Sequence, residues 1–189
     1  MAGPDGTVFD LANDAGKQSL ADTGALYWAN TIARKIKEID PQALVSAGMF
    51  SNLAVERSGF GNMCHDNTVD SRMPLRPLVL LGSDLDFIDI HSYAVPDYTF
   101  QQELDSIEWQ KVKQQAAVLG KPVLLGEFGV FKHHYSDPQT ALRVLGNHFQ
   151  QTAEEGFVGH LLWTCDTHEQ PEIWNAQDAS GEFFRAMSE

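Results

Sequence analysis

Short apolar runs alternate with amphipathic segments along the chain, and this alternation constrains the fold more than any other feature. Five runs have the length and composition of β-strands: residues 7–13, 43–49, 85–93, 123–128 and 157–164. Apolar residues three and four positions apart predict helices at residues 19–40, 75–81, 99–119, 138–156 and 181–187. Strands that alternate with helices favour a parallel sheet joined by right-handed crossovers.

The chain of 189 residues is long enough for one domain with a hydrophobic core, and residues 1–189 are expected to form a single domain. Its formal net charge of −13 argues against nucleic acid as a partner, because phosphates are bound by lysine and arginine. No apolar run is long enough to span a membrane. The chain as given has no signal peptide, which leaves its compartment undecided. Cys64 and Cys165 are expected to be free thiols.

Polar and aromatic side chains gather where the predicted strands end. They are Asn13, Asp14, Met49, Phe50, His91, Tyr93, Glu127, Trp163, Asp166 and His168. An open doubly wound sheet would place its ligand at one switch point and usually carries a glycine-rich phosphate loop, and the sequence has neither sign. Groups spread over every strand end are typical of a β/α barrel, whose active site lies at the carboxyl ends of its strands.

Glu127 is the strongest candidate for chemistry. Residues 121–129 read Lys-Pro-Val-Leu-Leu-Gly-Glu-Phe-Gly, an apolar run that ends in a single carboxylate flanked by glycines. A short, continuous apolar run is typical of a strand buried on both faces, so its last side chains project beyond the sheet. The alternative is a strand-end glutamate that forms a structural ion pair with lysine or arginine.

Hydrolysis of a glycosidic bond is one reaction in which a strand-end glutamate could act, and it takes two carboxyl groups. If Glu127 is one of them, Asp14 is best placed to supply the second. One carboxyl group protonates the leaving oxygen, and the other attacks the anomeric carbon or activates water. Asn13 beside the acid could hold the 2-hydroxyl of the sugar. The same pair, followed by Ala15 and Gly16, is equally typical of a loop or of the lead-in to a helix.

Three further residues are candidates for binding a sugar. His91 and Tyr93 share one face of a strand, because side chains alternate, and both could hydrogen-bond a carboxylate or sugar hydroxyls. They could equally form a half-buried polar pair that satisfies itself. Trp163 could be the flat apolar platform under a pyranose ring, or it could belong to the core.

The sequence predicts no metal site and no cofactor. His65, His133 and His134 match none of the ligand spacings of known metal motifs, and they are expected to be solvated loop residues. No phosphate loop and no serine nucleophile motif is present. Chemistry that uses two carboxyl groups and water needs no cofactor.

Several segments resemble, in order, the second half of retaining glycoside hydrolases of the cellulase and mannanase type, family 5 and its clan relatives. They run from the fourth strand of that barrel to its last helix: residues 8–14, 36–48, 88–93, 122–129, 161–163 and 180–186. Their strand ends carry Asn-Asp, His-x-Tyr, Glu and Trp in the family's order. A complete barrel takes about 250 residues. The resemblance therefore implies a partial (β/α) TIM-type barrel made of about the last five β/α units, equivalent to strands 4–8.

The resemblance also implies roles for single residues. Glu127 would be the nucleophile, and Asp14 would be the acid/base in altered form, because the family has glutamate there. The sugar would be positioned by Asn13, His91, Tyr93 and Trp163. The implied reaction is hydrolysis of β-glycosidic bonds in poly- or oligosaccharides, and the implied partner is a carbohydrate. The family is often secreted.

Two other interpretations remain open. The chain could be a catalytically impaired carbohydrate-binding remnant, which the aspartate at position 14 and the missing first strands favour. It could also be an unrelated barrel enzyme, such as an aldolase or isomerase with Glu127 as a base. Those enzymes usually use a phosphate-binding loop or a Schiff-base lysine, whereas Lys121 begins its strand at the wrong end and Lys132 lies beyond it.

A partial barrel predicts self-association. Two strand edges would be unpaired, and the inner face would expose apolar residues such as Val8, Leu44, Ile88, Leu124 and Leu161. A barrel interior is a packed core, and the marginal stability of a domain could hardly absorb its exposure to water. We therefore expect a homodimer or another self-association that completes the barrel.

Overall fold

The computed structural model describes residues 1–50, 73, 75–96, 100–165 and 170–188. Residues 51–72, between the second predicted strand and the second predicted helix, fall outside this range. The predictions for Cys64, His65, Asp166 and His168 therefore lie outside the described residues.

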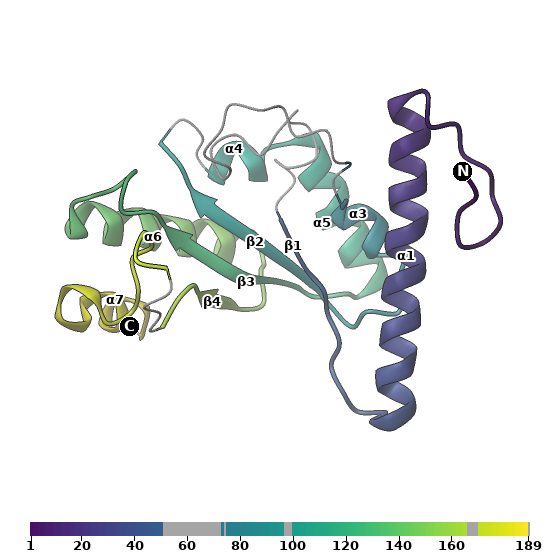
Figure 1. The fold of residues 1–189 in the computed structure, drawn as a ribbon. Helices are drawn as coiled ribbons and strands as arrows, with labels where there is room; N and C mark the ends of the chain where they lie inside the picture. The colour runs from purple at the N-terminus through teal and green to yellow at the C-terminus, as the bar shows by residue number, and fades with distance from the viewer. Residues whose placement is uncertain (51–72, 74, 97–99, 166–169, 189) are drawn as a thin grey trace.

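Four parallel strands form one sheet, and their order in the sheet is their order in the sequence (Figure 1). They are β1 (Gly48–Phe50), β2 (Ile88–Ala94), β3 (Val123–Val130) and β4 (His160–Leu162). Helices lie between successive strands, so the expected alternation with parallel pairing is confirmed. Sequential parallel strands are the arrangement found in a segment of a β/α barrel.

Three of the six described helices begin at residues whose side chains cap them. The six are α1 (Asp14–Ile39), α3 (Pro77–Leu80), α4 (Phe100–Leu104), α5 (Ile107–Leu119), α6 (Pro138–Glu154) and α7 (Asp178–Ser188). The capped helices are α1, α5 and α6. Asp137 caps α6 by accepting a hydrogen bond from the backbone of Thr140, and Pro138 takes the first helical position. No helix in this part of the chain is long and apolar enough to cross a membrane.

The single helix expected at residues 99–119 is wrong, because two helices occupy this stretch. α4 ends at Leu104, and Ser106 then caps α5 by accepting a hydrogen bond from the backbone N–H of Trp109 at 3.1 Å. A serine that satisfies a free backbone donor favours a new helix start over continuation. Gly120 ends α5 in the left-handed conformation, with φ of 61°.

The hydrophobic core lies on one face of the sheet, where α5 and α6 pack. It contains the strand residues Ile88, Ile90, Leu125, Phe128 and Val130, together with residues of both helices such as Trp109, Val112, Ala141 and Leu145. Ile88 was expected on the inner face of a barrel, and that expectation is wrong, because its side chain is fully buried in this core.

The opposite face of the sheet turns toward the viewer in Figure 1, and no described helix covers it. Leu161 of β4 and Leu44, which precedes β1, are both exposed. β2 presents to this face the residues that alternate with its buried isoleucines, namely Asp89, His91 and Tyr93. This open face therefore carries polar groups in its middle and apolar groups at its sides.

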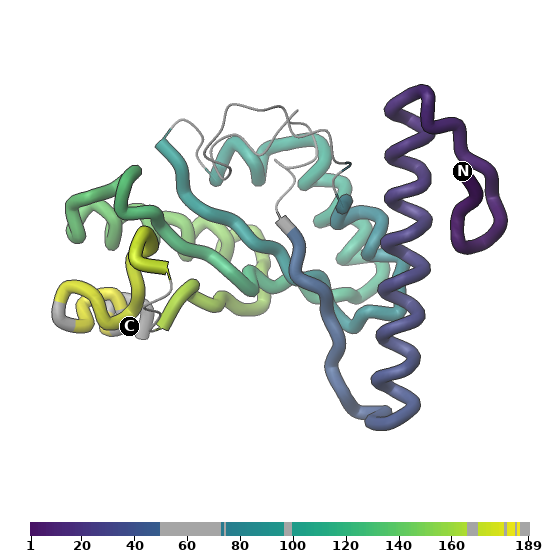
Figure 2. The backbone as a smooth tube through the Cα atoms, viewed as in Figure 1, coloured from purple at the N-terminus to yellow at the C-terminus, as the bar shows by residue number. Residues whose placement is uncertain are grey.

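Residues 7–13 do not form the expected fifth strand. They make one isolated antiparallel bridge, between Ala2 and Val8, and lie beside α1 on the side away from the sheet (Figures 1 and 2). The carboxylate of Asp10 accepts hydrogen bonds from the Ala12 backbone at 2.9 Å and the Asn13 side chain at 2.8 Å. Local side-chain bonds of this kind compete with strand pairing.

Candidate active site

A β-bulge at Gly126 brings the polar ends of β2 and β3 onto the same face. Ile90 is paired with Leu125 and His91 with Glu127, so β3 has one extra residue at this point. Side chains alternate along a regular strand, so with residues 125–127 paired without a bulge Glu127 would share the helix-covered face with Leu125. The bulge turns Glu127 to the open face, where His91 lies.

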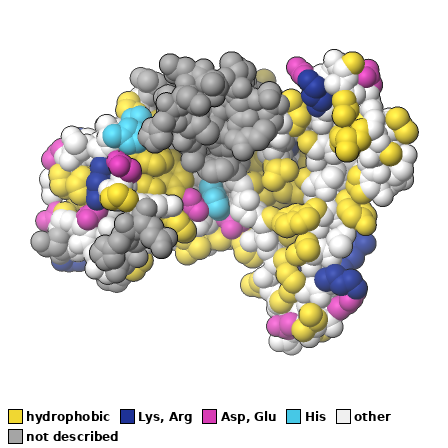
Figure 3. Space-filling view, in the orientation of Figure 1, with side chains coloured by type: hydrophobic (Ala, Val, Ile, Leu, Met, Phe, Trp, Pro, Cys, Tyr) yellow, Lys and Arg dark blue, Asp and Glu magenta, His cyan; other side chains and the backbone are white. Residues whose placement is uncertain are grey.

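Both oxygens of the Glu127 carboxylate have a partner on β2. The Tyr93 hydroxyl donates a short hydrogen bond to Oε1. Nδ1 of His91 lies 3.4 Å from Oε2. The side chain of Glu127 is 20% exposed, so the carboxylate is held in a fixed position and still reaches solvent. Figure 3 shows histidine and acidic side chains side by side in the middle of this face.

The surroundings of His91 favour its protonated form. Interaction with Asp89 raises the pKa of the imidazole above its usual value, and the negative charge of Glu127 adds to this effect. Burial acts in the opposite direction and is outweighed. The two neighbouring carboxylates therefore stabilise the protonated form of the imidazole.

Tyr93 is a neutral donor to Glu127. Burial is the main cause that raises the pKa of its hydroxyl well above the usual range, and the hydrogen bond to Glu127 raises it further. Its ring stacks on Phe131 with the ring centroids 5.0 Å apart. A Cβ atom at Gly129 would lie 2.9 Å from the Tyr93 ring, so the glycine leaves room for this packing.

Trp163 follows β4, one strand beyond Glu127. Its backbone N–H donates to the carbonyl of Phe128 at 2.8 Å, and its indole N–H donates to Oε1 of Gln170 at 2.6 Å. The side chain is 36% exposed, which leaves part of the indole available to a ligand. The strand ends therefore bring His91, Tyr93, Glu127 and Trp163 to neighbouring positions, and their roles in sugar binding remain predictions.

Asn13 and Asp14 lie elsewhere. Asn13 is the N-cap of α1, and its side chain accepts a hydrogen bond from the backbone N–H of Gly16 at 2.8 Å. Asp14 is the first helical residue, is 83% exposed, and forms an ion pair with Lys17 at 2.9 Å. This end of α1 is well separated from β3 in Figure 1. Asn13 and Asp14 therefore have the local structure of a helix lead-in, which was one of the two interpretations of this pair.

The sequence profile of the cellulase family, glycosyl hydrolase family 5, matches residues 4–169. The chain belongs to glycosyl hydrolase family 5. The family resemblance drawn from the strand-end motifs is therefore confirmed. A search of curated proteins finds no match to the sequence.

Solved structures of β-mannanases share this family 5 fold. One is an endo-β-1,4-mannanase from Thermotoga petrophila, with 20% identity and a TM-score of 0.51, over 85% of this chain and 36% of the mannanase. Another is the hyperthermostable endo-1,4-β-D-mannanase from Thermotoga petrophila RKU-1, with 18% identity and a TM-score of 0.52, over 89% of this chain and 51% of the mannanase. The family 5 chain thus spans about half or less of the structures that it matches.

Asp89 is a residue of this family 5 site that the sequence did not single out. It lies two positions before His91 on the same face of β2, and its Oδ1 is 3.6 Å from Nε2 of the imidazole. The Asp-x-His-x-Tyr alternation at residues 89–93 was a signal that could have identified it. Gly126 inside an apolar strand was likewise a signal for the bulge.

Three other polar groups of the family 5 chain were also candidates for chemistry, and within the described residues they form no comparable site. Among the described residues, no cluster of three or more histidine, cysteine, aspartate or glutamate side chains could hold a metal ion. His133 and His134 pack against each other with ring centroids 4.0 Å apart. The ammonium of Lys121 donates to the carbonyls of Leu81 and Ser83, at the opposite end of β3 from Glu127.

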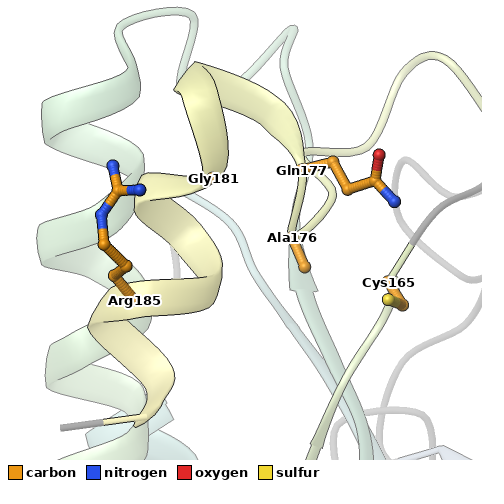
Figure 4. Close-up of a pocket in the computed structure, with 5 residues that line it drawn as sticks. All are labelled: Cys165, Ala176, Gln177, Gly181 and Arg185. Carbon is orange, nitrogen blue, oxygen red and sulfur yellow. The ribbon is translucent and has the colours of Figure 1, made fainter.

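A separate hollow of about 400 Å³ lies beside α7 (Figure 4). It is lined by Cys165, Ala176, Gln177, Gly181 and Arg185. None of the predicted site residues lines it, so the strand-end cluster remains the candidate active site of this family 5 chain.

Proposed function

We propose that this chain is a glycoside hydrolase that cleaves β-glycosidic bonds of poly- or oligosaccharides, with Glu127 as the nucleophile. The observation that carries the proposal is the Glu127 carboxylate, which is fixed by Tyr93 and His91 at the end of β3 and still reaches solvent. The related structures are mannanases, so β-1,4-linked mannan is the first natural substrate to test.

The proposed mechanism is retaining. Glu127 attacks the anomeric carbon and forms a covalent glycosyl-enzyme, which water then hydrolyses. Tyr93 and His91 orient the two oxygens of the carboxylate that acts as nucleophile. Trp163 is proposed as the platform for the sugar ring, and Asn13 as a ligand of its 2-hydroxyl. We also propose that β1 to β4 correspond to the last four strands of a barrel.

A carbohydrate-binding remnant without turnover is the second candidate. The observation that favours it is the separation of Asp14 from Glu127, because hydrolysis by this mechanism takes two cooperating carboxyl groups. Turnover of a chromogenic aryl β-glycoside, measured beside calorimetric binding of β-mannan oligosaccharides, separates the two candidates. Turnover supports the hydrolase, whereas binding without turnover supports the remnant. Absence of both contradicts the two candidates.

Asp14 is proposed as the acid/base from the family resemblance. To reach Glu127, residues 7–13 would have to pair as a strand with β1, which is an edge of the sheet. Asp14→Glu restores the residue of the family and is expected to raise the release of reducing sugar from β-mannan. Asp5→Glu makes the same change in the N-terminal loop and is the control. An unchanged or lower rate for Asp14→Glu contradicts the assignment.

We also propose that two copies of the chain associate through the open face. Figure 3 shows hydrophobic side chains exposed on this side of the molecule. Leu161 of the edge strand β4 is 57% exposed, and Leu44, which precedes the other edge strand, is 78% exposed. Exposed apolar patches of this kind are typical of interfaces. β1 and β4 are the two edges of the sheet, and each presents unpaired backbone groups to a partner.

Light scattering at micromolar concentration is expected to give about twice the chain mass of 21.0 kDa. Leu161→Lys places a charge on the open face and is expected to shift the protein to monomer. Ile107→Lys is the matched control, because Ile107 is 75% exposed at the start of α5, on the helical side. A folded monomer of the parent chain would overturn the proposal.

A further inference from the structure

We propose that Asp89 is a positioning residue of the candidate active site, which holds His91 oriented and positively charged beside Glu127. Asp89 does not touch Glu127 in the structure and would act through the imidazole. The proposal rests on the proposed function in one respect, since it takes Glu127 to be the group that reacts. The charge of His91 can be measured whether or not the chain hydrolyses a glycoside.

The three side chains form a line across the open face of the sheet. Oδ1 of Asp89 lies 3.6 Å from Nε2 of His91, and Nδ1 of the same ring lies 3.4 Å from Oε2 of Glu127. The two ring nitrogens thus face two different carboxylates, one from β2 and one from β3. The side chains are between 18% and 22% exposed, so solvent screens these charges only in part.

The hydrogen-bonding capacity of the ring favours its charged form. A neutral imidazole carries one N–H, so one of its nitrogens would turn a lone pair toward a carboxylate. Only the imidazolium presents a donor to both Asp89 and Glu127. Interaction with Asp89 is also the largest of the effects that raise the pKa of His91.

A positive charge on His91 also lowers the cost of burying the carboxylate of Asp89. Its Oδ1 is buried and accepts no hydrogen bond within the part of the chain that the structure describes. A buried carboxylate oxygen is costly unless an opposite charge lies nearby. The ion pair that Asp89 forms among these residues is with His91.

Two glycines fix the positions of the carboxylate and the ring. A Cβ atom at Gly126 would lie 1.8 Å from Oδ1 of Asp89, and one at Gly48 would lie 2.5 Å from Nε2 of His91. Any larger residue at either position would displace the pair. The bulge residue of β3 therefore makes room for Asp89 and also turns Glu127 toward His91.

Within the described strands, three residues besides Glu127 face His91. β2 supplies Asp89 and Tyr93, β3 supplies Glu127, and β1 supplies the uncharged Gly48. Tyr93 donates to the other oxygen of Glu127 and stays neutral. Asp89 and Glu127 are thus charges that favour the proton on the ring, and the loss of Asp89 removes the first of them.

The test is a titration of the histidine side chains by NMR, with the His91 signal assigned from its absence in His91→Gln. Asp89→Asn keeps the shape of the side chain and removes its charge. We expect the pKa of His91 to fall by about 1 unit or more, since an opposite charge at this distance shifts a pKa by 1–3 units. Asp84→Asn is the control, because Asp84 pairs with Arg34 at the surface.

The outcomes separate this inference from the proposed function. An unchanged pKa of His91 in Asp89→Asn, relative to Asp84→Asn, overturns the role of Asp89 even if the chain is an active hydrolase. A lowered pKa supports that role even if no variant shows turnover. If Asp89→Asn fails to fold, Asp89→Ser removes the same charge with a smaller side chain, and the same comparison decides.

In an active chain, the pH profile of kcat/KM gives a second readout. Activity that depends on the imidazolium falls as pH rises through the pKa of His91. Asp89→Asn should therefore move the falling limb to lower pH by the shift that NMR measures, whereas a structural defect would lower the whole profile. A profile that falls without moving would overturn the positioning role.

Discussion

Replacement of Glu127 by glutamine is expected to lower hydrolysis of an aryl β-glycoside by at least about a thousandfold, the scale on which loss of a nucleophile acts. The amide keeps the size of the side chain and an oxygen that accepts from Tyr93, so fold and sugar binding should persist. The amide cannot form the glycosyl-enzyme bond, because its oxygen is a poor nucleophile. Initial rates and calorimetric binding, measured on the same preparations, check both halves of the prediction.

Glu155→Gln is the matched control for this experiment. Glu155 caps the C-terminal end of α6 and pairs with Lys113 at 2.7 Å, so the variant loses the same charge far from the strand ends. It should hydrolyse the substrate at the parent rate. A Glu127→Gln protein that keeps the parent rate would show that another group is the nucleophile.

Acidification is expected to destabilise the chain through His148. The imidazole is buried between α6 and the sheet, stacks on Phe100 with ring centroids 4.0 Å apart, and has no hydrogen-bond partner for Nε2 among the described residues. Burial is the main cause that lowers the pKa of His148 to about 3, and nearby His160 lowers it further. As pH falls below the ordinary histidine pKa, the unfolded chain therefore binds a proton at His148, whereas the folded chain does not.

The stability that this histidine contributes is complete above about pH 6.5 and is lost progressively as pH falls toward 3. Between about pH 7 and about pH 5 the free energy of unfolding should drop by about 2 kcal/mol. Urea denaturation at the two pH values measures this difference. The window lies above the pKa of ordinary carboxyl groups, so they contribute little to it.

His148→Leu removes the titrating group and keeps an apolar side chain of similar volume. We expect this variant to lose most of the pH dependence. His133→Gln is the control, because it removes a histidine that is exposed at the surface, and it should keep the slope of the parent. An equal drop in all three proteins would assign the acid sensitivity to other groups.

The sheet was largely predictable from the sequence, because its strands are continuous apolar runs. The run at residues 123–128 predicted β3 almost to its ends. The run at residues 85–93 predicted β2, which begins only at Ile88 in the structure. Residues 7–13 carry a similar apolar pattern and form no strand, because the side chains of Asp10 and Asn13 bind the local backbone. Pattern alone does not reveal whether a partner strand is available to pair.

The site was predictable where it depends on alternation along one strand. His91 and Tyr93 were expected on a common face, and both contact Glu127. The alignment of β3 with β2 was not predictable in the same way, because it depends on the bulge at Gly126. Alternation along the strand also places Asp89 on the face of His91, but only the folded strand shows that its carboxylate lies 3.6 Å from the ring.

The bulge in β3 makes the strand end sensitive to its register with β2. Regular pairing through Gly126, without the bulge, would place Glu127 opposite the buried Ser92 and Phe128 opposite Tyr93. The carboxylate would then point into the helix-packed core, and a phenyl ring would stand where the nucleophile is proposed to act. A glutamate after an apolar run is therefore not enough to place a carboxylate on the open face. Relatives whose strand pairs without the bulge would have the same side chains and an inverted strand end.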